Sequence, residues 1–121
     1  MQSPDAIIVG AGPAGLACAM TMRKVGLAAV VLEKADTVGS AWRRHYDRLC
    51  LHSHRRHSGL PGMAMPESYP AYPSRAQIVD YLEAYRRGLI SGPPSTRRYR
   101  TSGARARNGV RKQGRGRYRR R

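Results

Sequence analysis

A glycine-rich turn between two short apolar segments constrains this chain more than any other feature. Residues 6–9 are apolar and largely β-branched, which is typical of a buried parallel strand. The string Gly-Ala-Gly-Pro-Ala-Gly at residues 10–15 follows directly and leads into a segment of helical composition, residues 14–25. A second apolar run at residues 28–32 ends at Glu33. This order predicts one βαβ unit, the opening of a doubly wound α/β fold.

The spacing of the turn indicates a dinucleotide site. Gly10 permits the tight turn, Gly12 lets the backbone approach a pyrophosphate, and Gly15 lets the helix lie close to the strand. The helix N-terminus offers N–H groups and partial positive charge to phosphates. Glu33 is placed to accept hydrogen bonds from a ribose diol, and its charge disfavours a 2′-phosphate, so the site suits FAD or NAD rather than NADP. The alternative is a glycine turn that binds no ligand.

The middle of the chain predicts loops followed by a helix. Residues 34–73 contain many Gly and Pro residues and no sustained periodicity, which favours a segment that wraps a ligand or partner. Ser74 and Gln77 have the spacing of a capping box, so a helix is expected to start at Ser74. Its apolar face would consist of four residues at helical spacing: Ile78, Tyr81, Leu82 and Tyr85.

Charge divides the chain near Arg86. Residues 1–85 carry nine Lys and Arg and all seven acids, whereas residues 86–121 carry fourteen Lys and Arg and no acid. The second part is an Arg/Gly-rich segment expected to be a disordered tail that binds polyanions non-specifically. We also consider that this tail is a frameshift product. No run reaches the ~20 apolar residues of a membrane span, and two cysteines make no disulfide framework, so a cytoplasmic location is expected.

Several blocks after Glu33 resemble the flavin-containing monooxygenase family, over about Asp5–Tyr85. The glycine motif is shared by many flavoproteins, but the block at residues 42–51 and the Tyr-Pro block are much more specific. The blocks that carry the resemblance are residues 39–42 (Gly-Ser-Ala-Trp), 45–52 (His-Tyr-Asp-Arg-Leu-Cys-Leu-His), 60–63, 69–75 (Tyr-Pro-Ala-Tyr-Pro-Ser-Arg) and 78–82. A departure is Ser40, where the family often has glycine.

The resemblance implies a fold and a function. Residues 1–85 would be the N-terminal βαβ part of a Rossmann-like FAD/NAD(P)-binding domain, incomplete in this chain. The function implied is that of an FAD-dependent, NADPH-consuming monooxygenase, an oxidoreductase acting on a small-molecule substrate. The residues expected to bind FAD are Gly10, Gly12, Pro13, Ala14, Gly15, Glu33, Lys34, Ser40, Trp42, Leu51 and His52.

No catalytic residue can be named from the sequence. The family's second glycine motif, which binds NADPH, and its Phe-Gly-His signature are not found in the 121 residues, which contain no Phe. We therefore expect the chain alone to be a truncated portion without monooxygenase turnover.

Two alternatives for the function stay open beside this interpretation. The chain could belong to another two-domain flavin oxidoreductase, or be a small basic nucleic-acid-binding protein that acts through residues 86–121. His52, His54 and His57 have close spacing, but no Cys pair or carboxylate completes a metal site, so no metal is expected. A Cys50–His52 nucleophile pair lacks a nameable orienting acid.

Overall fold

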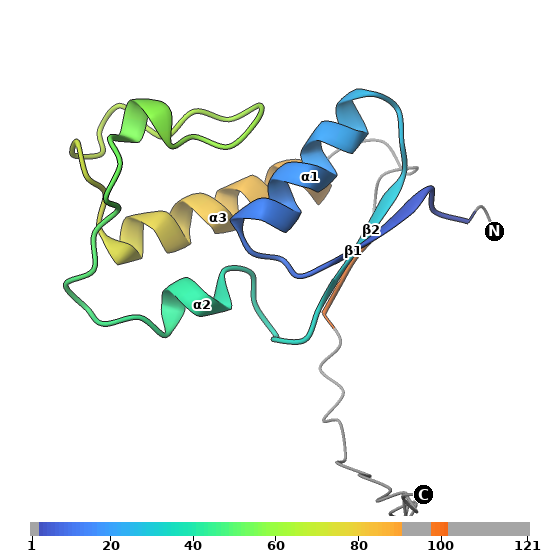
Figure 1. Cartoon of the computed structure of the whole chain (residues 1–121), viewed down its shortest axis with the longest axis horizontal. Coiled ribbons are helices and arrows are strands. Elements are labelled where there is room, and N and C mark those ends of the chain that lie inside the picture. Colours follow the sequence, from blue (N-terminus) through green and yellow to red (C-terminus); the bar gives the residue numbers. More distant parts are fainter. Residues whose placement is uncertain (1–2, 91–97, 102–121) are drawn as a thin grey trace, which may run out of the picture.

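The computed structural model describes residues 3–90 and 98–101 and has the predicted α/β architecture. Its strands form one parallel sheet in the order β1-β2-β3 (Figure 1). Helix α1 packs on β1 and β2, while α3 packs against α1 and α2. In chain order the elements are β1 (Ala6–Val9), α1 (Pro13–Lys24), β2 (Ala29–Glu33), α2 (Ser40–Arg43), the 3₁₀ turn η1 (Arg55–His57), α3 (Arg75–Ile90) and β3 (Arg98–Thr101).

The βαβ unit predicted from the glycine turn is confirmed. Strands β1 and β2 pair in parallel, with Ala6 opposite Ala29 and Val9 opposite Leu32. Helix α1 starts at Pro13, because proline already has helical φ and loses no hydrogen bond at the first helical position. Gly26 follows its last turn with φ of 80°, the left-handed conformation that glycine adopts without strain.

Gly15 sets the close approach of α1 to the end of β1. A Cβ added at Gly15 would lie 1.9 Å from the backbone O of Gly10 and 3.4 Å from a methyl group of Ile8. The chain can make this approach only without a side chain at position 15, as the spacing of the motif predicted.

The predicted helix cap and apolar face of α3 are both present. The Ser74 N–H donates to Gln77 Oε1 at 2.9 Å, and the Gln77 N–H donates to Ser74 Oγ at 3.2 Å. This reciprocal pair is the capping box. The residues predicted for the apolar face are all buried in the core: Ile78, Tyr81, Leu82 and Tyr85.

Two tyrosine hydroxyls of α3 hold the loop that follows η1. Tyr81 Oη accepts from the Leu60 N–H at 2.8 Å and donates to the Met63 carbonyl at 2.5 Å. Tyr85 Oη donates to the Pro61 carbonyl at 2.5 Å. Burial raises the pKa of Tyr85 to about 12, so the hydroxyl keeps its proton and remains a donor.

Residues 34–73 are irregular as predicted, apart from α2 and η1. Backbone hydrogen bonds tie this segment to the start of α3. The Leu51 N–H donates to the Pro73 carbonyl and the Arg75 N–H donates to the Leu49 carbonyl, both at 2.8 Å. These hydrogen bonds hold the irregular segment against the start of α3.

The sequence predicts an irregular chain from Arg86 onward, and the structure differs from this prediction in two places. Helix α3 continues to Ile90, because Leu89 packs against the core and Arg23 Nη1 donates to the Gly88 carbonyl at 2.6 Å. Residues 98–101 form β3, which pairs in parallel with β2 along Val30–Glu33. The rest of the expected tail, residues 91–97 and 102–121, lies outside the described residues.

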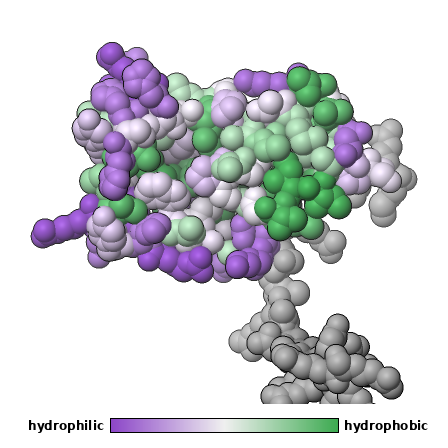
Figure 2. Space-filling view, in the orientation of Figure 1, coloured by the Kyte–Doolittle hydropathy of each residue, from purple (hydrophilic) through white to green (hydrophobic). Residues whose placement is uncertain are grey.

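Strand β1 leaves two apolar side chains exposed. Ile7 and Val9 are 63% and 84% exposed, whereas Ile8 between them packs against the core. Figure 2 shows apolar side chains gathered over the strands at the right of the view. Within residues 3–90 and 98–101, no helix has the length and hydropathy needed to cross a membrane.

We predict that Gly15→Ala destabilises the fold by at least about 3 kcal/mol, because the added methyl overlaps backbone that no rotamer change can move. Urea denaturation would measure the change in the free energy of unfolding. Gly88→Ala is the matched control, since it also lies in a helix and no described atom falls within 4 Å of its added Cβ. The control should be neutral or gain about 0.5–1 kcal/mol. Equal effects for the two variants would contradict the role of Gly15.

We predict that Tyr81→Phe costs about 1–3 kcal/mol of unfolding free energy, because the Leu60 N–H and the Met63 carbonyl both lose a partner. Chemical denaturation checks the value. Tyr46→Phe serves as a control because Tyr46 is exposed. A Tyr81→Phe variant as stable as this control would show that the hydroxyl contributes nothing to holding the loop.

Candidate functional site

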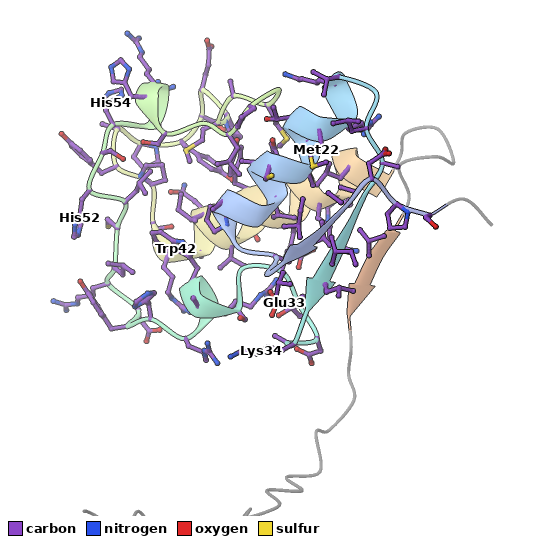
Figure 3. The ribbon with its side chains drawn as sticks, turned by 45° about the vertical axis from the view of Figure 1, so that its right-hand side comes forward. Met22, Glu33, Lys34, Trp42, His52 and His54 are labelled. Atoms are coloured by element: carbon purple, nitrogen blue, oxygen red, sulfur yellow. The ribbon has the colours of Figure 1, made fainter. Side chains whose placement is uncertain are left out.

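The glycine turn and Glu33 lie together at the carboxyl ends of β1 and β2. Pairing of Val9 with Leu32 brings the two strand ends side by side, and the Gly10 N–H donates to the Leu32 carbonyl at 2.7 Å. Figure 3 shows Glu33 and Lys34 at this end of β2, beside the start of α1. Ligands of doubly wound folds bind at the carboxyl ends of the strands.

The turn between β1 and α1 has room for a phosphate-bearing ligand. Gly12 is extended, with φ of −82° and ψ of −175°, and no described atom would lie within 4 Å of a Cβ there. No described side chain caps the N-terminus of α1, and its first turn contains no acid. An uncapped helix N-terminus behind an open glycine backbone fits a pyrophosphate, which can accept the N–H groups.

Glu33 makes a second kind of contact that the sequence did not predict. Its side chain reaches back to the glycine turn, where Oε2 accepts from the Ala11 N–H at 2.7 Å. Oε1 accepts from the Ala35 N–H at 3.0 Å, and the residue is only 7% exposed. A ribose hydroxyl at this position would therefore meet a carboxylate that the backbone already orients.

These contacts keep Glu33 ionised. The hydrogen bond from the Ala35 N–H has the largest effect and lowers the pKa of the carboxyl below its ordinary value of 4.5. Burial opposes this effect, and the Ala11 N–H adds to it. The net direction is downward, so the carboxylate is negatively charged at neutral pH.

Helix α2 carries two further predicted residues, Ser40 and Trp42, and the residue before it contacts the glycine turn. The Gly39 N–H before the helix donates to the Ala11 carbonyl at 3.1 Å. Gly39 has φ of 62°, and a Cβ there would lie 2.8 Å from Leu82 Cδ1, so glycine lets α2 approach α3. Trp42 packs partly buried against the core.

An arginine network fixes α2 against α3. Arg43 Nη2 donates to Glu83 Oε1 at 2.6 Å and its Nε donates to the Val38 carbonyl at 3.2 Å. Arg75 Nη1 donates to the Arg43 carbonyl at 2.6 Å. The sequence does not predict this network, because nothing in the local pattern pairs residues 40 positions apart.

Leu51 and His52 lie further from the glycine turn. Leu51 is partly buried against the core, whereas His52 is exposed. In Figure 3 His52 lies at the edge of the molecule away from Glu33, with Trp42 between them. The structure thus brings Gly10, Gly12, Pro13, Ala14, Gly15, Glu33 and Lys34 together at the carboxyl ends of β1 and β2. Ser40 and Trp42 lie in α2, and Leu51 and His52 lie in the loop after it.

The remaining candidates from the sequence are the cysteines and the histidines of the loop after α2. Cys18 and Cys50 are free and exposed. His54 Nδ1 accepts from the Arg56 N–H at 3.1 Å and so serves the local turn. In the part of the chain that the structure describes, no three His, Cys, Asp or Glu side chains are grouped to hold a metal ion.

Comparison with known proteins places the chain among flavoproteins. Residues 7–88 match the family model described as pyridine nucleotide-disulphide oxidoreductase. The chain is 53% identical over 83 residues to an indole-3-pyruvate monooxygenase, YUCCA1, of Oryza sativa subsp. japonica. That match covers 68% of this chain and 20% of the relative, so the chain spans a small part of the length of the curated relatives it matches.

The chain is also similar to solved structures of monooxygenases. A flavin-containing monooxygenase from Stenotrophomonas maltophilia superimposes with a TM-score of 0.66 at 35% identity, over 73% of this chain and 27% of that one. An oxidized steroid monooxygenase bound to NADP gives a TM-score of 0.60 at 27% identity, over 73% of this chain and 18% of that one. The resemblance to flavin-containing monooxygenases seen in the sequence is confirmed.

We predict that Glu33 contributes stability that acid removes. Its pKa is lower in the folded chain, so this contribution is present above pH 4.5 and is lost as pH falls through the folded value. Glu33→Gln should cost about 1–3 kcal/mol at pH 7, because an amide cannot accept both N–H groups equally. It should also flatten the fall in unfolding free energy as pH is lowered from 4.5 through the folded pKa.

Unfolding free energies measured across this pH range would check both effects. Asp36→Asn is the control, since Asp36 is an exposed carboxylate on the same loop. The role of Glu33 is refuted if the Gln variant keeps the pH profile of the unchanged chain.

Proposed function

This chain belongs to the pyridine nucleotide-disulphide oxidoreductase family, and we propose that it supplies the ADP-binding part of an FAD site in a flavin-dependent monooxygenase. One observation carries the proposal. The open backbone at Gly12 leads into an uncapped helix N-terminus, and the ionised carboxylate of Glu33 lies beside it. This combination fits a diphosphate joined to a ribose with an unmodified diol.

Each part of the proposed cofactor has a place along the described surface. Gly12 and the first turn of α1 would hold the pyrophosphate, and Glu33 would hold the adenosine ribose, with Lys34 exposed beside it. The residues of α2 and of the loop after it face the remainder of the cofactor. The complete proposed set is Gly10, Gly12, Pro13, Ala14, Gly15, Glu33, Lys34, Ser40, Trp42, Leu51 and His52.

The activity proposed for the whole protein is NADPH-consuming oxygenation of a small molecule. When bound, FAD would supply the redox chemistry of such an oxygenation. Support comes from the relative named for indole-3-pyruvate and from the solved steroid monooxygenase bound to NADP. We assign no residue of this chain to NADPH, oxygen or catalysis, and we expect no turnover from it alone. The cytoplasmic location stays a prediction.

The alternative enzyme interpretation predicts the same FAD site. Another two-domain flavin oxidoreductase would use the glycine turn and Glu33 in the same way, so FAD binding alone does not separate the two. The 53% identity to a monooxygenase relative favours oxygenation.

A second proposed function concerns residues 86–121. Their fourteen Lys and Arg and absence of acids support non-specific polyanion binding with a steep dependence on salt. A gel shift of DNA or RNA that survives deletion of residues 1–85 and weakens sharply with added salt would support it. A shift that requires residues 1–85 would refute it.

We predict that Gly12→Asp weakens FAD and ADP binding to the full chain at least about tenfold, because the added carboxylate meets the phosphates in the open space above residue 12. Flavin fluorescence and calorimetry measure the two affinities. Thr21→Asp adds the same charge at an exposed position further along α1 and should leave both affinities unchanged.

Melting curves separate folding from binding in this experiment. The Gly12 variant should melt like the unchanged chain in the absence of ligand, since no described atom opposes the new Cβ. Equal FAD affinity in the two Asp variants would overturn the proposed site.

A further inference from the structure

A hollow lies on a part of the molecule that the proposed FAD site does not use. Its volume is about 390 Å³, within the range of small-molecule pockets. It is formed by η1 and by the loop that leads from η1 toward α3. The residues that line it are Arg55, Arg56, Gly59, Ala64, Met65 and Glu67.

The wall that carries the two arginines is held in place by its own hydrogen bonds. The Arg55 N–H donates to the Ala71 carbonyl at 2.8 Å. The Arg56 N–H donates to His54 Nδ1 at 3.1 Å, and Ser58 Oγ donates to the His54 carbonyl at 2.8 Å. His54 is labelled in Figure 3 at the start of this turn. The arginines therefore project from a backbone that is already ordered.

The opposite wall is fixed to the core. Gly59 packs against the loop, and a Cβ there would be in ordinary contact with Ala64 Cα at 3.4 Å. Tyr81 holds the intervening residues through Leu60 and Met63, and Met65 is buried. Both sides of the hollow are thus formed before any ligand arrives, which reduces the entropy lost on binding.

The charges that line the hollow are not used by the fold. Among the ion pairs of the described residues, none involves Arg55, Arg56 or Glu67. Two arginines and one glutamate therefore line one hollow, and no ion pair joins them to each other. A ligand that matches this lining has an anionic group for the arginines and a cationic group for the glutamate.

We propose that this hollow binds a small zwitterion of the amino-acid class. The carboxylate of the ligand is received by Arg55 and Arg56, its ammonium by Glu67, and its carbon chain lies toward Met65. Binding here does not require FAD, because the glycine turn and Glu33 contribute nothing to the hollow. The site can therefore be tested independently of the proposed oxidoreductase function.

The test is a titration of the full chain followed by two-dimensional NMR, with glycine, 4-aminobutyrate and 6-aminohexanoate as probes. Acetate and methylammonium carry one charge each and serve as reference ligands. We expect saturable shifts at Gly59 and Ala64 with at least one zwitterion, and binding at least about tenfold weaker for either single-charge ligand.

Three variants separate the roles. Arg55→Gln and Glu67→Gln should each weaken zwitterion binding about tenfold, while Arg48→Gln, an exposed arginine outside the hollow, should leave it unchanged. Acetate binding as tightly as the zwitterions, with no effect of Glu67→Gln, would reveal an anion site and overturn the proposal. A folded chain without saturable shifts for any probe would overturn it as well.

Discussion

The buried carboxylate of Glu33 connects the two loops from which the candidate site is built. It accepts from Ala11 in the turn after β1 and from Ala35 in the turn after β2. Gly12 and the N-terminus of α1 follow Ala11 directly, so the orientation of the helix end depends on this contact. The Ala11 carbonyl in turn accepts from Gly39 and so positions α2. One acid at the end of a strand thus organises three segments of the chain.

The parts of the fold that depend on local sequence were predicted well. The βαβ unit follows from apolar runs and glycine spacing, and both need only about 30 residues of context. The capping box at Ser74 and Gln77 is likewise local, as is the apolar face of α3. In each case the pattern of neighbouring residues is enough to predict the element, although packing on α1 and α2 is what buries the face of α3.

The features that were missed depend on residues far apart in the chain. Tyr81 was assigned only to the helix core, yet its hydroxyl binds a loop 18 residues away. Arg43 and Glu83 meet only because α2 packs on α3. Composition alone placed the change of character at Arg86, whereas α3 continues to Ile90 with the help of Arg23. Contacts between residues so far apart leave no periodic pattern in the sequence from which they could be predicted.

Gly12 and Gly15 are required for different reasons, so selection acts on them differently. Any replacement at position 15 collides with the chain's own backbone, so it is removed whether or not a cofactor binds. Position 12 opens to empty space, so only a ligand requires glycine there. In a lineage that had lost the cofactor, residue 12 would drift while residue 15 stayed glycine. The substitutions that accumulate at these two codons would thus record whether nucleotide binding is still under selection.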